Sequence, residues 1–148
     1  MAYSSINNIL KEMSQSELAR LTGDAQGLEI NEGRVNIAIL YADTMIDASL
    51  LGRYEVPFEG EIEPLILKLS VDLAIANLYE FAFSKSSIPL TVYKRKQNAL
   101  DILKELQRGN INLKASNPGT SSPPVIISNK SKSKRIFDDD KLDLFTEL

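Results

Sequence analysis

Apolar residues recur three and four positions apart through the first two thirds of the chain, which is the spacing of one face of an α-helix. The pattern predicts a short helix over residues 6–13 and a second one that begins at Ser14 or Ser16. Ser14 and Glu17 have the spacing of a capping box. A loop is expected after these two helices, where glycine and aspartate cluster.

A long helix is predicted next, beginning at Asn31 or Glu32 and ending at Gly52, because glycine tolerates the positive φ that often follows a helix. Its apolar residues form two stripes, so we expect neighbouring elements to surround it nearly completely. The first stripe contains Val35, Ala38, Ile39, Ala42, Ile46 and Leu50, and the second contains Ile37, Leu40, Tyr41, Ala48 and Leu51.

Two further long helices are predicted after an acidic loop. The first begins at Pro64, whose missing N–H costs nothing at the first helical position, and it is again apolar on most sides. Lys68 and Asp72 can pair across one turn of this helix. The second covers residues 90–108 and is amphipathic, with apolar residues on one side and lysines on the other.

The predicted architecture is therefore all-α. We expect a compact bundle of about four to five helices over residues 1–108 and an extended, linker-like C-terminal arm over residues 109–148. Residues 111–113 could form a short edge strand or part of that arm. Residues 117–133 are rich in serine, proline and lysine, which is typical of a linker.

The end of the arm, residues 135–148, has the features of a short docking motif. Asp138 can cap a helix, and Phe137 and Leu142 have the spacing of a hydrophobic staple. The alternative is a frayed terminus. The lysine cluster just before this motif is partly cancelled by three aspartates, so we favour contact with protein over contact with DNA.

Two helices that are apolar on most sides exceed what one small bundle needs to bury. At about 25 cal/mol per Å², an uncovered patch of a few hundred Å² favours association by several kcal/mol. The alternative is that the N-terminal helices and the acidic loop cover everything. The pattern favours a homo-oligomer.

Composition limits the chemistry further. The chain has no histidine and no cysteine, which excludes Ser-His-Asp, Cys-His and thiolate chemistry and removes the commonest zinc ligands. No apolar run is long enough to span a bilayer and the N-terminus lacks the pattern of a signal peptide, so no membrane association is expected. No phosphate-binding glycine loop is present. We expect no enzymatic function, no cofactor and no metal.

The carboxylates are the remaining candidates for chemistry. Asp43 and Asp47 share one helix face, which could hold a metal or act as acid and base, but we favour a solvated or interfacial strip because no third ligand is signalled nearby. The loop after the long helix carries Glu55, Glu59, Glu61 and Glu63. We favour a solvated loop; the alternative is an interface or lumen-facing surface that avoids holding DNA, and residues 1–108 are acidic as a whole.

Three residues at the start of the acidic loop, Arg53, Tyr54 and Phe58, are expected to take part in ion pairing or packing. Arg53 is expected to pair with Glu55 or with an acid of a neighbouring subunit. Tyr54 and Phe58 are expected to pack rather than to stack on bases, because no basic groove surrounds them. Lys94, Arg95 and Lys96 are consecutive on a helix and so form no single patch.

An ordered set of motifs resembles the small head–tail connector (adaptor) proteins of tailed bacteriophages, in the branch related to Mu-like prophages. The set comprises Tyr3, the segment from Glu17 to Thr22, Asp47-Ala48, Leu51-Gly52-Arg53-Tyr54, Pro57, the helix from Pro64 to Tyr79, and Ile136-Phe137 with Lys141-Leu142 and Phe145. The long linker and the heavily acidic loop depart from the family pattern.

The resemblance implies a ring of copies, typically twelve, beneath the portal protein in the virion neck. Such a ring extends the DNA channel, lets DNA pass through its lumen without specific binding, and docks the next neck or tail protein. On this basis we expect subunit or partner contacts at Asp47, Arg53, Tyr54, Glu55, Phe58, Glu59, Glu61, Arg135, Ile136, Phe137, Leu142 and Phe145.

Two other hypotheses stay open. A helical adaptor or regulatory module would bind a protein partner through the C-terminal motif and would be a monomer or a dimer. An enzyme using Asp43 and Asp47 would be stabilised by a divalent metal ion.

Overall fold

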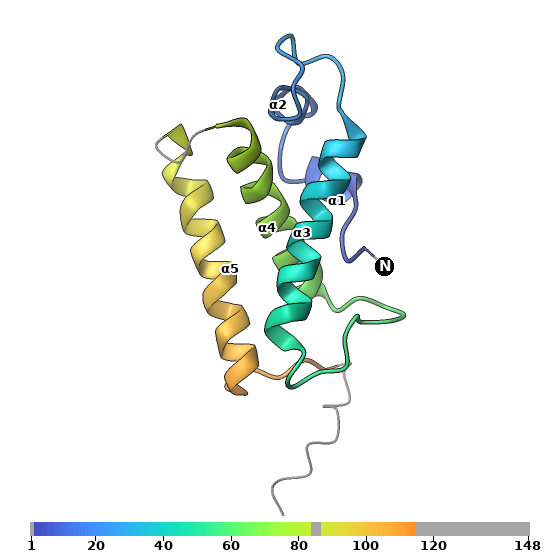
Figure 1. Cartoon of the computed structure of the whole chain (residues 1–148), viewed down its shortest axis with the longest axis vertical. Helices are drawn as coiled ribbons and strands as arrows, with labels where there is room; N and C mark the ends of the chain where they lie inside the picture. The colour runs from blue at the N-terminus through green and yellow to red at the C-terminus, as the bar shows by residue number, and fades with distance from the viewer. Residues whose placement is uncertain (1, 84–86, 115–148) are drawn as a thin grey trace, which may run out of the picture.

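Five α-helices form the part of the chain that the computed structural model describes, residues 2–83 and 87–114 (Figure 1). Within these residues there is no strand, so the predicted all-α fold is confirmed and residues 111–113 are not a strand. The helices are α1 (Ile6–Leu10), α2 (Gln15–Leu21), α3 (Glu32–Leu50), α4 (Pro64–Ala82) and α5 (Leu90–Arg108).

The helix starts follow the sequence signals. The Ser14 side chain accepts a hydrogen bond from the Glu17 N–H at 3.2 Å, and the Asn31 side chain caps α3 in the same way. Pro64 is the first residue of α4, as predicted. Only half of the predicted capping box forms, because the Glu17 carboxylate binds the hydroxyl of Tyr79 on α4 instead.

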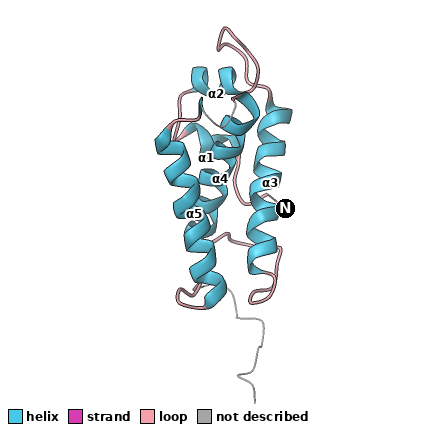
Figure 2. Ribbon diagram, turned by 60° about the vertical axis from the view of Figure 1, so that its left-hand side comes forward, coloured by secondary structure: helices cyan, strands magenta, loops and turns pink. Residues whose placement is uncertain are grey.

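The three long helices lie side by side along the long axis of the molecule, with α4 between α3 and α5 (Figures 1 and 2). α1 and α2 pack on the same core near the N-terminal half of α3. Eleven of the nineteen residues of α4 are buried, so neighbours surround this helix on nearly all sides. Its continuous apolar sequence is explained by this central position.

α3 is buried on one side only. Its first stripe, from Val35 to Leu50, forms the core together with α4. The second stripe is exposed: Ile37, Leu40, Tyr41 and Leu51 are 46%, 60%, 55% and 70% exposed. Our interpretation that α3 is surrounded nearly completely is therefore wrong within the described residues, because the N-terminal helices and the acidic loop pack elsewhere.

The end of α3 also differs from expectation. Gly52 does not have a positive φ; the helix ends at Leu50, and the N–H groups of Arg53 and Tyr54 both bond the Leu50 carbonyl at 2.9 Å in one further turn. Gly109 has the left-handed conformation instead, with φ +85°, and it ends α5. Residues 110–114 then pass beneath the C-terminal end of α3 (Figure 1).

Candidate interaction surface

The N-terminus ties the acidic loop to α3 through Tyr3, which is 2% exposed. The Tyr3 hydroxyl donates a hydrogen bond to Asp47 and accepts one from the Phe58 N–H at 2.9 Å. Its ring packs against Phe58 with centroids 5.7 Å apart, and Phe58 in turn packs against Tyr54. Burial and, to a smaller extent, the hydrogen bond to Asp47 raise the pKa of the Tyr3 hydroxyl. The loop is thus anchored at one tyrosine.

Asp43 is buried rather than solvated, which corrects the predicted polar strip. It is 5% exposed and accepts hydrogen bonds from the Tyr3 N–H at 2.9 Å and from the Ser70 hydroxyl at 2.6 Å. Ser4 completes the group, with its hydroxyl 2.7 Å from that of Ser70. Burial raises the pKa of Asp43, and these hydrogen bonds offset part of that effect. The carboxylate holds the N-terminal segment on the bundle.

Arg53 does not pair with Glu55. Its guanidinium donates a 2.6 Å hydrogen bond to the Asn112 side chain, lies 5.7 Å from the centroid of the Tyr54 ring, and covers Gly109 so closely that a Cβ there would overlap it. Arg53 forms no ion pair with any described residue, so the expectation of pairing with Glu55 is wrong. It joins the end of α3 to the segment after α5.

Tyr54 is 4% exposed, so its predicted packing role is confirmed. No described residue hydrogen-bonds its buried hydroxyl.

Ion pairs hold α5 to its neighbours. Arg95 bonds Asp72 at 2.7 Å and Glu12 at 2.8 Å, and Asp72 also forms the predicted pair with Lys68 at 2.9 Å. The adjacent Lys96 bonds Glu80 on another side of α5. These basic residues point to different partners, which confirms that they form no single patch.

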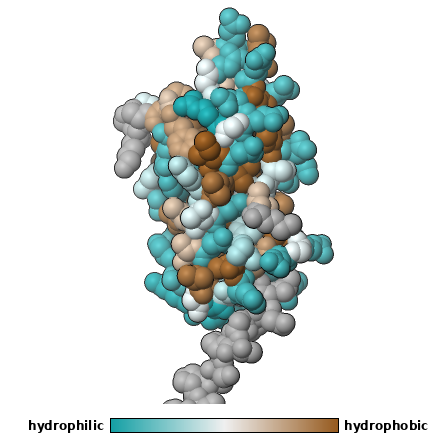
Figure 3. Space-filling view, turned by 45° about the vertical axis from the view of Figure 1, so that its right-hand side comes forward, coloured by the Kyte–Doolittle hydropathy of each residue, from teal (hydrophilic) through white to brown (hydrophobic). Residues whose placement is uncertain are grey.

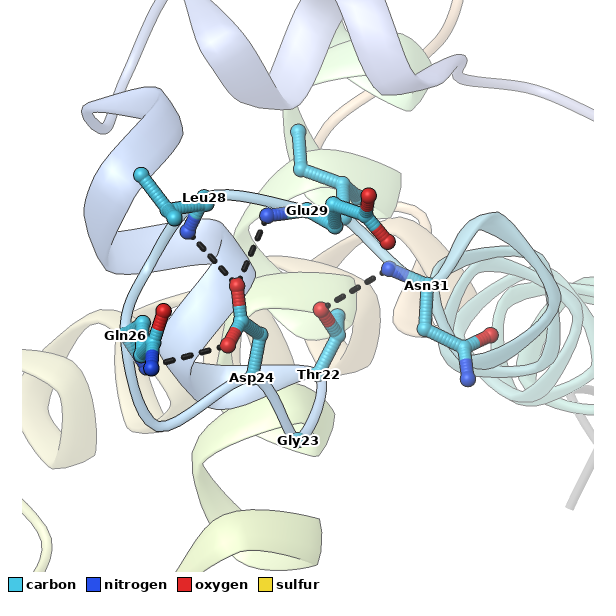
Figure 4. A pocket seen from close by; sticks show the side chains of 8 residues that line it. Thr22, Gly23, Asp24, Gln26, Leu28, Glu29 and Asn31 are labelled. Carbon is cyan, nitrogen blue, oxygen red and sulfur yellow. Dashed lines mark hydrogen bonds between the residues drawn. The ribbon is translucent and has the colours of Figure 1, made fainter.

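A polar hollow of about 550 Å³ lies in the loop between α2 and α3 (Figure 4). The Asp24 carboxylate accepts hydrogen bonds there from the N–H groups of Gln26, Leu28 and Glu29, which lower its pKa. Thr22 accepts a further one from the Asn31 N–H at 3.1 Å. These oxygens are used to shape the loop itself, so the hollow has no feature that indicates a ligand.

The described residues contain neither a group of three or more acidic side chains placed to hold a metal ion nor a helix long and apolar enough to cross a membrane.

The main surface feature is therefore apolar. We define the α3 outer face as the exposed residues Ile37, Leu40, Tyr41, Met45, Ala48 and Leu51. Phe81 of α4 extends it, because its ring lies edge-on to that of Tyr41 with centroids 6.0 Å apart. In the space-filling view, hydrophobic side chains interrupt the hydrophilic surface along the length of the molecule (Figure 3). Asp43 is buried and Asp47 is bound to Tyr3, so no exposed charge interrupts the α3 outer face.

The predicted contact residues are only partly brought together. Asp47, Arg53, Tyr54 and Phe58 gather around Tyr3 and the end of α3, and Glu55, Glu59 and Glu61 are exposed on the loop beside them. Arg135, Ile136, Phe137, Leu142 and Phe145 lie outside the described residues. Their contacts with other subunits stay a prediction.

Sequence reasoning missed the polar group that Asp43 forms with Ser4 and Ser70. The available signal was Ser70, a hydroxyl inside an otherwise apolar helix, which indicates a buried polar partner.

A protein-family model described as "Bacteriophage Mu, Gp36" matches residues 3–125. The match spans the whole bundle and continues past α5. No curated protein matches the chain at a significant level.

Proposed function

The chain belongs to the Bacteriophage Mu Gp36 family, and on that premise we propose that it is a structural head–tail connector of the virion neck. In this proposal copies of the chain form a ring, of about twelve members, beneath the portal protein. The ring extends the DNA channel and docks the next neck or tail protein. The subunit acts by packing and performs no covalent chemistry.

The observation that carries the proposal is the α3 outer face. With about 200 Å² for each fully exposed large side chain, its exposed fractions and that of Phe81 correspond to roughly 600 Å² of surface. The largest apolar patch of an ordinary monomer is about 300–600 Å² and is often functional, and a stable interface buries about 800 Å² on each partner. A second copy of the chain could cover most of this face.

The negative charge of the acidic loop supports the proposal that DNA passes the ring without being held. Glu55, Glu59 and Glu61 are exposed on one loop, and such clustered carboxylates repel phosphate. A closed ring needs two different, complementary surfaces on each subunit. The α3 outer face is one candidate, and this acidic loop, held in place by Tyr3, is a candidate for contact with a neighbour or the portal.

The test is to mix the protein with isolated portal rings and to image what forms. We expect rings with the wild-type chain and none with Leu40→Asp, because an aspartate on the α3 outer face would be buried in the subunit contact without a partner. Asn98→Asp places the same charge on the exposed side of α5 and should assemble normally. Normal rings with Leu40→Asp, or single subunits on the portal, would refute the proposal.

A further inference from the structure

A groove of about 670 Å³ lies between α3 and α5, with α4 as its floor. Its α3 wall is one edge of the α3 outer face and carries Tyr41, Met45 and Ala48. Its α5 wall carries Lys96 and Gln107. Tyr41 and Met45 are 55% and 42% exposed, so the groove presents apolar side chains to whatever binds there.

The two walls differ in charge. The groove-facing part of α3 has no exposed charged side chain. Elsewhere the groove is lined by Lys96 of α5 and Glu80 of α4, which form an ion pair, and α5 as a whole has five lysines or arginines against two acids. An apolar groove wall beside a helix of net positive charge fits a segment that is both apolar and acidic. DNA does not fit this description, because a phosphate backbone has nothing to place against Tyr41 and Met45.

The chain itself contains a segment of this kind. Residues 135–148 carry five acids against two basic residues, and their apolar members are Ile136, Phe137, Leu142, Leu144, Phe145 and Leu148. The charge is therefore opposite to that of α5, and the apolar content is sufficient to cover the α3 wall.

The attachment point of this segment is also suitable. The described structure ends at Lys114, whose N–H bonds Glu63 at 3.0 Å, close to where Asn112 bonds Arg53. This is the end of the bundle at which α5 finishes, one residue after Gln107 of the groove. A random coil of the length of residues 115–134 spans about 25 Å on average, and α3 is about 28 Å long, so the whole groove lies within reach.

We propose that residues 135–148 dock in the groove between α3 and α5 of their own chain in the isolated subunit. The connection is short enough to give an effective concentration in the millimolar range, which favours docking within one chain over docking between copies. The docked segment covers Tyr41 and Met45 and leaves Leu40 and Leu51, on the other edge of the α3 outer face, available for a neighbouring copy. The inference concerns the free subunit and does not depend on ring assembly.

The chain lacks cysteine, so disulfide trapping in the full-length protein can test this directly. In Met45→Cys/Leu144→Cys, we expect mild oxidation to give a crosslinked monomer, at a rate independent of protein concentration. The matched control is Asn98→Cys/Leu144→Cys, because Asn98 is exposed and lies about 200° around α5 from Lys96, which lines the groove. The groove pair should form its disulfide at least about tenfold faster than the control pair, a ratio that corresponds to about 1.4 kcal/mol.

A third substitution distinguishes docking of the segment from random collision of the two cysteines. Adding Phe145→Asp to the groove pair should reduce its crosslinking rate to that of the control pair, because the aspartate would lose the apolar contact with the α3 wall. Equal rates for the two pairs, or no effect of Phe145→Asp, would overturn the inference. A crosslinked dimer whose yield grows with protein concentration would also overturn it, because the segment would then dock on a second copy.

Discussion

Replacing Tyr3 with phenylalanine removes one oxygen atom from the centre of the contact between the N-terminus, α3 and the acidic loop. That oxygen donates to the Asp47 carboxylate and accepts from the Phe58 N–H. The phenylalanine ring would still fill the space of the tyrosine ring, so the substitution tests the two hydrogen bonds rather than the packing.

The expected loss of stability depends on how well water can replace the Tyr3 hydroxyl as the hydrogen-bond partner of the Asp47 carboxylate and of the Phe58 N–H. A hydrogen bond to a charged group contributes about 1.5–3 kcal/mol and a neutral one about 0.5–1.5 kcal/mol. Asp47 is half-buried, so water recovers part of the first contribution. We expect Tyr3→Phe to lower the free energy of unfolding by about 2 kcal/mol, measured by urea denaturation followed by circular dichroism. The control Tyr93→Phe, at a side chain that is 55% exposed, should cost less than about 0.5 kcal/mol.

The pH dependence of the free energy of unfolding is a second test of the same contact. Burial and the Asp47 hydrogen bond raise the pKa of Tyr3 above its ordinary value of 10.0. The corresponding stability is complete below pH 10 and is lost as the pH rises towards the pKa of the folded protein, because only the unfolded chain ionises there. Tyr3→Phe should lack this loss. Equal stabilities of Tyr3→Phe and Tyr93→Phe would refute the assignment of Tyr3 as the anchor of the loop.

Three further substitutions test other contacts, each measured by chemical denaturation. Gly109→Ala should destabilise by about 1–2 kcal/mol, because alanine is strained at φ +85° and its Cβ meets the Arg53 guanidinium; an unchanged unfolding midpoint would contradict this. Burial raises the pKa of Asp43 above 3.8, so the ionised carboxylate is disfavoured in the fold. The wild-type chain should therefore gain stability relative to Asp43→Asn as the pH falls through that raised pKa towards 3.8, and a difference that does not vary with pH would contradict it. Burial and, to a smaller extent, the hydrogen bond to Glu17 raise the pKa of Tyr79 from 10.0 to about 12. The stability advantage of the wild-type chain over Tyr79→Phe should accordingly shrink between pH 10 and pH 12, and an advantage that persists would argue against this contact.

Local signals in the sequence were sufficient for the helices themselves. Capping side chains at Ser14 and Asn31 and the proline at position 64 act within one turn of chain, so they can be recognised without knowing the neighbours. The same holds for the spacing of apolar residues, which depends only on the helical period. The all-α class and the extent of the long helices followed from these signals.

The interaction surface was less predictable, because it depends on which side of each helix another element covers. α3 and α4 have similarly apolar sequences, but α4 lies at the centre of the bundle and α3 at its edge, so only α3 is left with an exposed stripe. Periodicity shows that a helix has two apolar sides and not whether both have a neighbour.

The sequence alone thus determined where helices form, and that histidine and cysteine chemistry is absent, because both follow from the identity and local order of residues. The tertiary structure decided the roles of Asp43, Arg53 and Tyr3, since their partners are 27 to 59 residues away along the chain. A hydrogen bond across that distance exists only once the helices have packed. For the same reason, the uncovered side of α3 became visible only when the positions of α4 and α5 were known.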